Sequence, residues 1–118
     1  MDLKEGIDIS QYKQVEITFT FQSRNYKKGK DAIFIAYSLG GTKLRFLKKY
    51  RMGVTKTAGV NYPTFERNNV WYNAKAVYWV PKDLDPSKAA DFKFRIRGRG
   101  KSGRQRIMIK DVTVRGFA

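Results

Sequence analysis

Residues 15–22 read VEITFTFQ and carry the clearest strand pattern in the chain. Val15, Ile17, Phe19 and Phe21 alternate with polar residues, so the segment has one apolar and one polar side. Successive side chains of a β-strand point to opposite faces of the sheet. The alternation therefore predicts a strand with one face in a core and the other in water.

Five further segments have short apolar patterns and are separated by polar or glycine-containing turns. They are AIFIAYS at 32–38, TKLRFLKKY at 42–50, VWYNAKAVYWVP at 70–81, FKFRIRG at 92–98 and RIMIKDVTV at 106–114. No segment shows an apolar period of 3.6 over ten or more residues, so we expect no substantial helix. This pattern predicts an antiparallel β-sandwich or barrel.

The composition predicts a chain that folds and binds an anionic partner. Its 118 residues are 42% hydrophobic and 14% aromatic, which fits one domain over residues 1–118. Lys and Arg number 25 against 10 Asp and Glu, giving a net charge of +15. A field of this sign attracts nucleic acid, acidic polysaccharide or an anionic surface.

Several classes of activity have no support in the composition. Cys and His are absent, which excludes disulfides, thiol nucleophiles, imidazole bases and the usual zinc sites. No paired carboxylates or nucleophile group stand out, so we expect no enzymatic activity. The chain has no apolar run of membrane-spanning length, and residues 1–10 do not read as a signal peptide. We expect no membrane partner.

The order of the apolar segments resembles that of a widespread extracellular jelly-roll domain. Carbohydrate-binding modules appended to bacterial polysaccharide-degrading enzymes look like this, and MAM-type and galactose-binding-like domains have a similar strand order. The resemblance covers roughly residues 7–115. It implies an all-β jelly-roll sandwich of about seven to eight strands with little or no helix. It also implies a secreted or cell-surface bacterial module, excised here from a larger enzyme.

The same resemblance raises the question of calcium. Many relatives hold a structural calcium ion, and their last strand commonly reads Ile-Asp-Asp-Val. Here residues 109–112 read Ile-Lys-Asp-Val, so a base replaces one acid. Asp31 and Asp111 are the candidate ligands, with Asp8 a weaker one. We expect no required cofactor, with calcium as a possible structural ion.

A series of basic residues marks the first candidate site. Eight Lys or Arg lie between Lys93 and Lys110, with no acidic residue among them. Lys93, Arg95 and Arg97 alternate with apolar residues, so they form a ladder with a rise of ~6.6 Å per step on one face of a strand. A repeating polyanion fits such a ladder. A solvated outer face is the alternative, although solubility does not require one sign of charge.

Aromatic residues provide the second candidate site. Trp79 shares the polar face of its strand with Lys75 and Asn73, opposite Ala76 and Tyr78. An indole ring can stack on the C–H-rich face of a sugar, while Lys and Arg bind its sulfate or carboxylate groups. Further binding candidates come from the start of that strand, the 42–50 segment and the long loop after it: Trp71, Lys43, Arg45 and Tyr62. Packing against a sheet edge is the alternative for Trp71.

These observations predict a non-catalytic module that binds an acidic, sulfated polysaccharide through a basic face with aromatic platforms. A nucleic-acid-binding β-domain and a protein-adhesion domain are the alternatives. The chain has no RNA-recognition motif, no GXXG loop and no helix to enter a major groove, so we expect only nonspecific binding to nucleic acid. An enzyme acting on a polyanion ranks last.

Overall fold

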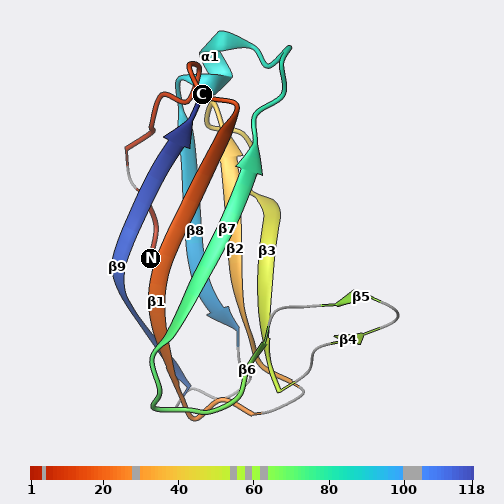
Figure 1. Cartoon of the computed structure of the whole chain (residues 1–118), viewed down its shortest axis with the longest axis vertical. Coiled ribbons are helices and arrows are strands. Elements are labelled where there is room, and N and C mark those ends of the chain that lie inside the picture. The colour runs from red at the N-terminus through yellow and green to blue at the C-terminus, as the bar shows by residue number, and fades with distance from the viewer. Residues whose placement is uncertain (4, 28–29, 54–55, 58–59, 62–63, 100–104) are drawn as a thin grey trace.

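The computed structural model describes residues 1–3, 5–27, 30–53, 56–57, 60–61, 64–99 and 105–118, and it shows two packed β-sheets (Figure 1). One sheet has the order β7 (Tyr72–Trp79), β1 (Gln14–Arg24), β9 (Arg106–Phe117). The other has the order β6 (Thr64–Phe65), β3 (Arg45–Met52), β2 (Ala32–Leu39), β8 (Phe92–Arg99). We call them the β1 sheet and the β2 sheet.

The chain passes repeatedly from one sheet to the other. β1 is central in its sheet, β2 is central in the second, β7 returns to the first, and β8 and β9 again lie in different sheets. Apart from the short parallel β6, each strand of the two sheets pairs antiparallel to its neighbours. The predicted all-β antiparallel sandwich is confirmed. Its layers contain six long strands within the described residues, compared with the seven to eight expected.

The remaining elements are small. β4 (Lys56–Thr57) and β5 (Val60–Asn61) pair as a hairpin that projects beside the β2 sheet (Figure 1). α1 (Pro86–Ala89) is a single helical turn, capped by Asp85, whose carboxylate accepts from the Ser87 N–H at 2.9 Å. No helix in the described part of the chain has the length and apolar character needed to cross a membrane.

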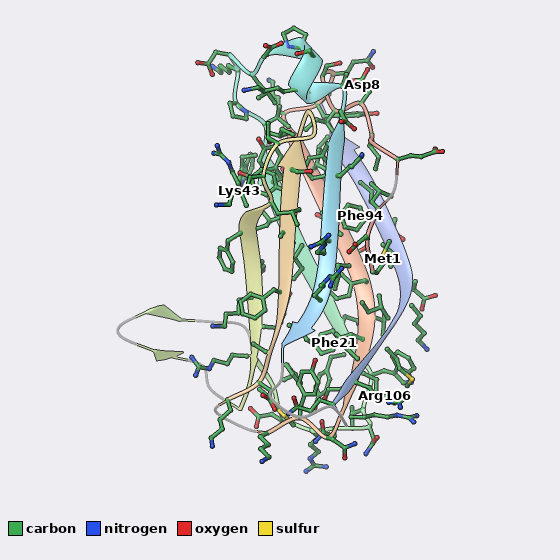
Figure 2. The ribbon with its side chains drawn as sticks, turned by 180° about the vertical axis from the view of Figure 1, so that it is seen from behind. Met1, Asp8, Phe21, Lys43, Phe94 and Arg106 are labelled. Carbon is green, nitrogen blue, oxygen red and sulfur yellow. The ribbon has the colours of Figure 1, made fainter. Side chains whose placement is uncertain are left out.

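The alternation in β1 places its apolar side chains between the sheets. Val15, Ile17, Phe19 and Phe21 are at most 2% exposed. Phe21 is the centre of an aromatic cluster and is labelled in Figure 2. Its ring contacts are with Phe65 at 5.1 Å, Tyr72 at 5.8 Å, Tyr50 at 6.0 Å and Phe19 at 6.1 Å between centroids. Burial of these rings supplies much of the hydrophobic stabilisation of this end of the sandwich.

Two strand edges are covered by contacts from elsewhere in the chain. The N-terminal segment pairs with the edge of β8, where the Leu3 N–H donates to the Phe94 carbonyl at 3.0 Å and the Ile7 N–H to the Phe92 carbonyl at 2.8 Å. At the edge of β7, the Tyr50 hydroxyl accepts from the Lys75 N–H at 2.8 Å and donates to the Lys75 carbonyl at 3.1 Å. These bonds satisfy backbone groups that an edge strand would otherwise leave open.

Tyr26 is buried where β1 leaves the sandwich, and its hydroxyl lies against Gly98 of β8. A β-carbon at position 98 would come within 1.7 Å of that oxygen. Burial, and then the negative charge of Asp31, raise the pKa of Tyr26 to about 12. The phenol of an unfolded chain ionises near pH 10. The neutral phenol therefore stabilises the fold fully below about pH 10, and this contribution is lost as the pH rises toward 12.

We expect the free energy of unfolding to fall by about 2 kcal/mol more in the wild type than in Tyr26→Phe between pH 9 and pH 12. Urea unfolding at several pH values measures this difference. Tyr12→Phe is the control, because Tyr12 is 37% exposed and its variant should follow the wild type. Equal losses in the wild type and Tyr26→Phe would contradict the prediction.

Candidate polyanion-binding face

The three residues of the predicted ladder lie on the outer face of β8. Phe92, Phe94 and Ile96 of the same strand are at most 2% exposed, so the intervening Lys93, Arg95 and Arg97 point away from the core. The Arg95 side chain is 38% exposed and that of Arg97 is 59% exposed. Both guanidinium groups are thus accessible to a ligand in solvent.

The ladder belongs to rows that cross the β2 sheet. On β2, the neighbours of the basic residues are small or flat: Ser38 beside Lys93, Ala36 beside Arg95 and Phe34 beside Arg97. β3 continues the rows with an exposed aromatic residue and a lysine. Two complete rows are Arg95–Ala36–Phe46 and Arg97–Phe34–Lys49. We call these six residues together with Lys93 the basic face.

The basic face joins cationic groups to aromatic rings. Phe46 is 61% exposed, which is unusual for so large an apolar side chain. The Lys49 Nζ lies 5.1 Å from the centroid of the Phe34 ring, within the range of a cation–π contact. The face therefore offers a ring for stacking beside groups that bind anions.

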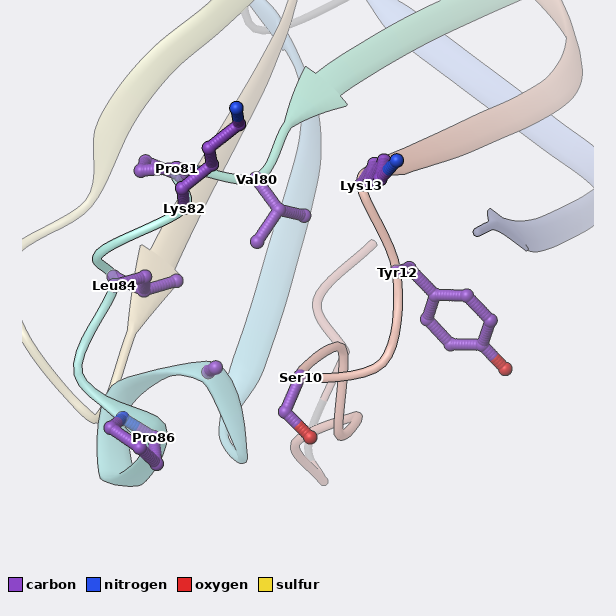
Figure 3. Close-up of a pocket in the computed structure, with 9 residues that line it drawn as sticks. Ser10, Tyr12, Lys13, Val80, Pro81, Lys82, Leu84 and Pro86 are labelled. Atoms are coloured by element: carbon purple, nitrogen blue, oxygen red, sulfur yellow. The ribbon is translucent and has the colours of Figure 1, made fainter.

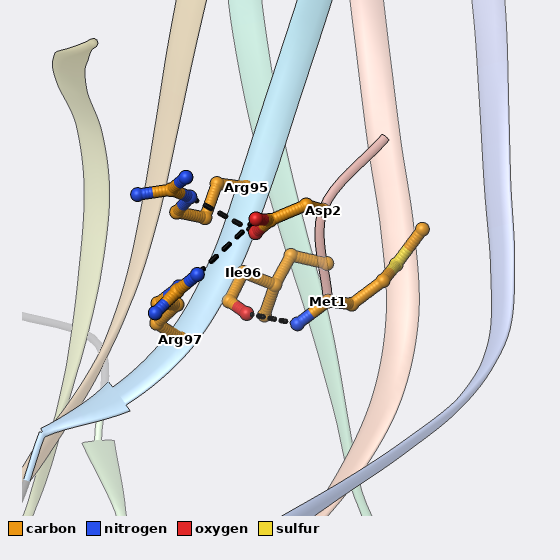
Figure 4. A network of polar contacts seen from close by, with 5 residues as sticks. All are labelled: Met1, Asp2, Arg95, Ile96 and Arg97. Carbon is orange, nitrogen blue, oxygen red and sulfur yellow. Dashed lines mark hydrogen bonds and ion pairs between the residues drawn. The ribbon is translucent and has the colours of Figure 1, made fainter. Parts of the chain in front are cut away.

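An acidic residue from the start of the chain contacts this face (Figure 4). The Arg95 Nε donates to one oxygen of the Asp2 carboxylate at 2.9 Å, and the Arg97 Nη2 donates to the other at 3.1 Å. The bond from Arg97, followed by that from Arg95, lowers the pKa of Asp2. The Ile96 N–H donates to the Met1 carbonyl at 2.8 Å and holds this segment in place.

A hollow of about 420 Å³ lies next to this contact. Two basic groups of the ladder, Lys93 and Arg95, reach its wall together with Asp2. Hydroxyl-bearing and apolar residues from the N-terminal segment, the ends of β2 and β8 and the β2–β3 turn complete it: Leu3, Ser38, Gly41, Thr42, Leu44 and Phe94. The hollow thus combines anion-binding groups with hydroxyl groups and apolar surface.

Lys43 and Arg45 are expected to extend the ladder if their segment shares its sheet. β3 and β8 do lie in one sheet, but the structure does not place Arg45 on the basic face. The β2–β3 pairing shifts register between Ile35 and Ala36, which leaves Leu47 as an extra residue in β3. Arg45 consequently pairs with Tyr37, whose ring packs inward against Tyr78 at 4.6 Å. Arg45 thus lies on the side of β3 opposite the basic face. Lys43 precedes β3 and lies in the exposed β2–β3 turn.

The same bulge decides which other basic residues of β3 join the face. Lys49 pairs with Phe34 and lies on the outer side, whereas Lys48 pairs with the buried Ile35. Burial, and then the positive charge of Lys75, lower the pKa of Lys48. A β-bulge shifts the alternation of side chains along a strand by one residue. Counting residues in the sequence therefore does not show which basic residues before and after Leu47 lie on the same face.

The aromatic candidates lie on the opposite outer face of the sandwich. Asn73, Lys75 and Trp79 point outward from β7 in the β1 sheet, and Trp79 is 68% exposed. Trp71 precedes β7, and the Lys110 Nζ lies 4.1 Å from the centroid of its ring. The structure therefore divides the predicted site residues between two faces and does not bring the tryptophans to the ladder.

Two of the predicted site residues on this second face, Lys75 and Asn73, already have polar partners within the protein. The Lys75 Nζ lies 3.4 Å from the Glu16 carboxylate, and the Thr20 hydroxyl donates to the Asn73 side-chain carbonyl at 3.1 Å. Asn73 and Lys75 also line a shallow hollow of about 400 Å³. On this face Glu16 is paired with the single basic candidate Lys75, whereas on the basic face the one acid Asp2 is shared by two arginines beside Lys93 and Lys49. The basic face therefore keeps the larger excess of positive charge.

A further cavity of about 310 Å³ lies at the end of the sandwich near α1 (Figure 3). Val80, Leu84 and Pro86 form part of its wall beside Tyr12. None of the predicted site residues is among the residues that line it, so it adds nothing to the basic face. Tyr62, another predicted contact, lies outside the described residues.

The candidate calcium ligands come from three different segments of the fold. Asp31 precedes β2 and is buried, and its carboxylate accepts from the Lys27 N–H at 2.6 Å and from the Gln105 side chain. Asp111 is exposed at a position of β9 with φ of 54°, and Asp8 accepts from the Ser10 N–H. In the described ranges no group of three or more acidic residues is arranged to hold a metal ion. The calcium site stays a prediction.

No family model, curated protein or solved structure matches the chain. The function must therefore be inferred from the chemistry of the surface. Planar guanidinium groups bind the oxygens of sulfate or carboxylate by two hydrogen bonds, and ammonium groups act as point charges. The basic face can hold a row of anionic groups and place an apolar ring beside them.

Proposed function

We propose that the protein is a non-catalytic carbohydrate-binding module that holds an acidic, sulfated polysaccharide on the basic face. The observation that carries the proposal is the arrangement of Arg95, Arg97 and Lys49 in cross-sheet rows with Phe34 and Phe46. Rows that cross the outer face of a sheet suit a long polymer, which needs to cross the site without ending in it. The resemblance of the apolar segments to those of modules appended to polysaccharide-degrading enzymes is the reason to propose an extracellular setting next to a larger enzyme.

The charge and the aromatic rings have different roles in this proposal. Basic groups lie ~6.6 Å apart along β8, and Lys49 lies two strand spacings of ~4.8 Å each across the sheet from Arg97. Successive anionic groups of one chain can therefore bind together. Stacking a sugar on Phe46 removes apolar surface from water and contributes about 1 kcal/mol. Charge supplies attraction, and the ring adds a preference for polyanions that have an apolar face to stack on it.

A comparison of matched polymers tests the proposal. We expect dextran sulfate to retard the protein in affinity electrophoresis, and unsulfated dextran, which has the same backbone, to leave its mobility unchanged. Polygalacturonate should retard the protein less than dextran sulfate and more than dextran, because it carries only one anionic group, a carboxylate, on each sugar. Each gel is run without added salt and again with 0.3 M NaCl.

Salt separates selective binding from attraction by charge alone. At 0.3 M salt the Debye length falls to about 6 Å, which screens long-range attraction but not hydrogen-bonded contacts. We expect retardation by dextran sulfate to become weaker at 0.3 M salt but to remain detectable. Binding to duplex DNA should be lost. Retardation by dextran alone, or equal salt-resistant binding to DNA, would contradict the proposal.

A further inference from the structure

The contact between Asp2 and the two arginines has the form of a bound ligand. Two oxygens on one carbon of Asp2 each accept one hydrogen bond, at 2.9 Å from Arg95 and at 3.1 Å from Arg97. A sulfate ester also presents oxygens on one central atom with negative charge shared among them. Alternate residues of a strand point to the same face, so the two guanidinium groups are held on one side of β8.

We propose that Arg95 and Arg97 form a subsite for one sulfate group of the ligand, and that Asp2 occupies this subsite until the ligand displaces it. The inference rests on the proposed function and locates its central contact. The carboxylate of Asp2 stands in for the anionic group of the polysaccharide. Asp2 is thus an internal competitor that lowers the apparent affinity.

The surroundings of the subsite fit a sulfated sugar. The adjoining hollow of about 420 Å³ is lined by Asp2 and Arg95 and includes Ser38, Thr42 and Lys93 in its wall. A sulfate on the arginines would place the attached sugar ring in or beside this hollow, close to the hydroxyl groups. Lys93 is one step along the strand from Arg95 and would meet another anionic group of the same chain.

Asp2 can be displaced because its contact with the arginines is exposed. Its side chain is 39% exposed, and exposed ion pairs contribute little to stability. The backbone bonds from Ile96 to Met1 and from Leu3 to Phe94 keep the segment along β8. The carboxylate therefore stays at high effective concentration near the arginines, which is the condition for effective intramolecular competition.

Asp2→Asn tests the competition, with Asp8→Asn as a matched control. Both variants remove one negative charge from the N-terminal segment, but the Asp8 carboxylate accepts from the Ser10 N–H and not from the arginines of the ladder. We expect Asp2→Asn to bind dextran sulfate about three- to tenfold more tightly than the wild type, and Asp8→Asn to gain less than twofold. Calorimetric titration at 0.15 M salt measures both. Equal affinities of the two variants would overturn the inference.

Inorganic sulfate tests the subsite without any polysaccharide. We expect sulfate to shift the ¹H–¹⁵N resonance of the Arg95 Nε in Asp2→Asn at lower concentrations than in the wild type. Equal shifts in both proteins would overturn the inference, whatever the polymers show. If the shifts differ as expected but dextran sulfate binds no better than dextran, the sulfate subsite stands and the proposed polysaccharide function fails.

A third variant separates local competition from a general effect of charge. In the background of Arg95→Ala with Arg97→Ala, the Asp2 carboxylate has lost both of its partners. We expect Asp2→Asn to gain no more than Asp8→Asn in that background, because the coupling requires the arginines. A gain that persists without the arginines would overturn the inference. Circular dichroism of each variant confirms that the sandwich is intact.

Discussion

Replacing Arg95 and Arg97 together with alanine should weaken binding to dextran sulfate by about ten- to fiftyfold while leaving the fold intact. Each guanidinium group can make charge-assisted hydrogen bonds, and the loss of two such partly exposed contacts is on the order of 2 kcal/mol. Stability should change by less than about 1 kcal/mol, because the pairs with Asp2 are on the surface. Calorimetric titration and urea unfolding of the same samples measure both effects.

The matched control is Lys75→Ala with Lys110→Ala. It also removes two positive charges, but from the opposite outer face. There Lys75 lies near Glu16 and Lys110 lies over Trp71. We expect its affinity to fall less than threefold, because only the general attraction is reduced. If the control loses as much affinity as the arginine variant, the ligand binds by net charge or on the other face. Unfolding of the arginine variant would show that the ladder has a structural role.

Phe21→Ala should cost about 3 to 5 kcal/mol of unfolding free energy, the usual range for removing a large buried aromatic side chain. Phe21 is fully buried and contacts four aromatic rings from β1, β3, β6 and the start of β7. Domains of this size are commonly stable by only 5 to 15 kcal/mol. The variant should therefore unfold at a much lower urea concentration than the wild type.

Phe46→Ala makes the same change of side chain but should affect binding and leave stability nearly unchanged. Phe46 is exposed on the basic face, so its loss should alter the unfolding free energy by less than about 0.5 kcal/mol. Its affinity for dextran sulfate should fall by a few-fold, because the stacking ring is gone. A stable Phe21→Ala variant would contradict the assignment of the core. A strongly destabilised Phe46→Ala variant would contradict the assignment of the basic face.

The alternation of apolar and polar residues was sufficient to predict several strands and their orientation. VEITFTFQ lies within β1 with its apolar side buried, and FKFRIRG lies within β8 with its apolar side in the core. Trp79 is exposed opposite the buried Ala76 and Tyr78, as the pattern of its strand indicates. The hydrophobic effect acts on each strand separately, so this part of the fold is visible in short stretches of sequence.

The assembly of the candidate site depends on information that local patterns do not contain. β7 and β8 follow one another in the chain but lie in different sheets, which separates the tryptophans from the ladder. The three-residue spacing of Leu44 and Leu47 predicts a bulge around Arg45 and Phe46, but the extra residue is Leu47, and this position moves Arg45 off the basic face. Asp2 meets arginines that are more than ninety residues away in the chain. Only the pairing of distant strands brings these groups together.

The first three residues affect both the ligand-binding arginines and the protection of a strand edge. Their backbone covers the edge of β8 at Phe94 and Ile96, and their one carboxylate engages Arg95 and Arg97. Proteolytic trimming of this short segment would therefore have a double effect. It would free the arginines for ligand. It would also uncover the edge of β8 at Phe94 and Ile96, where backbone groups without partners can recruit strands of other molecules and cause aggregation.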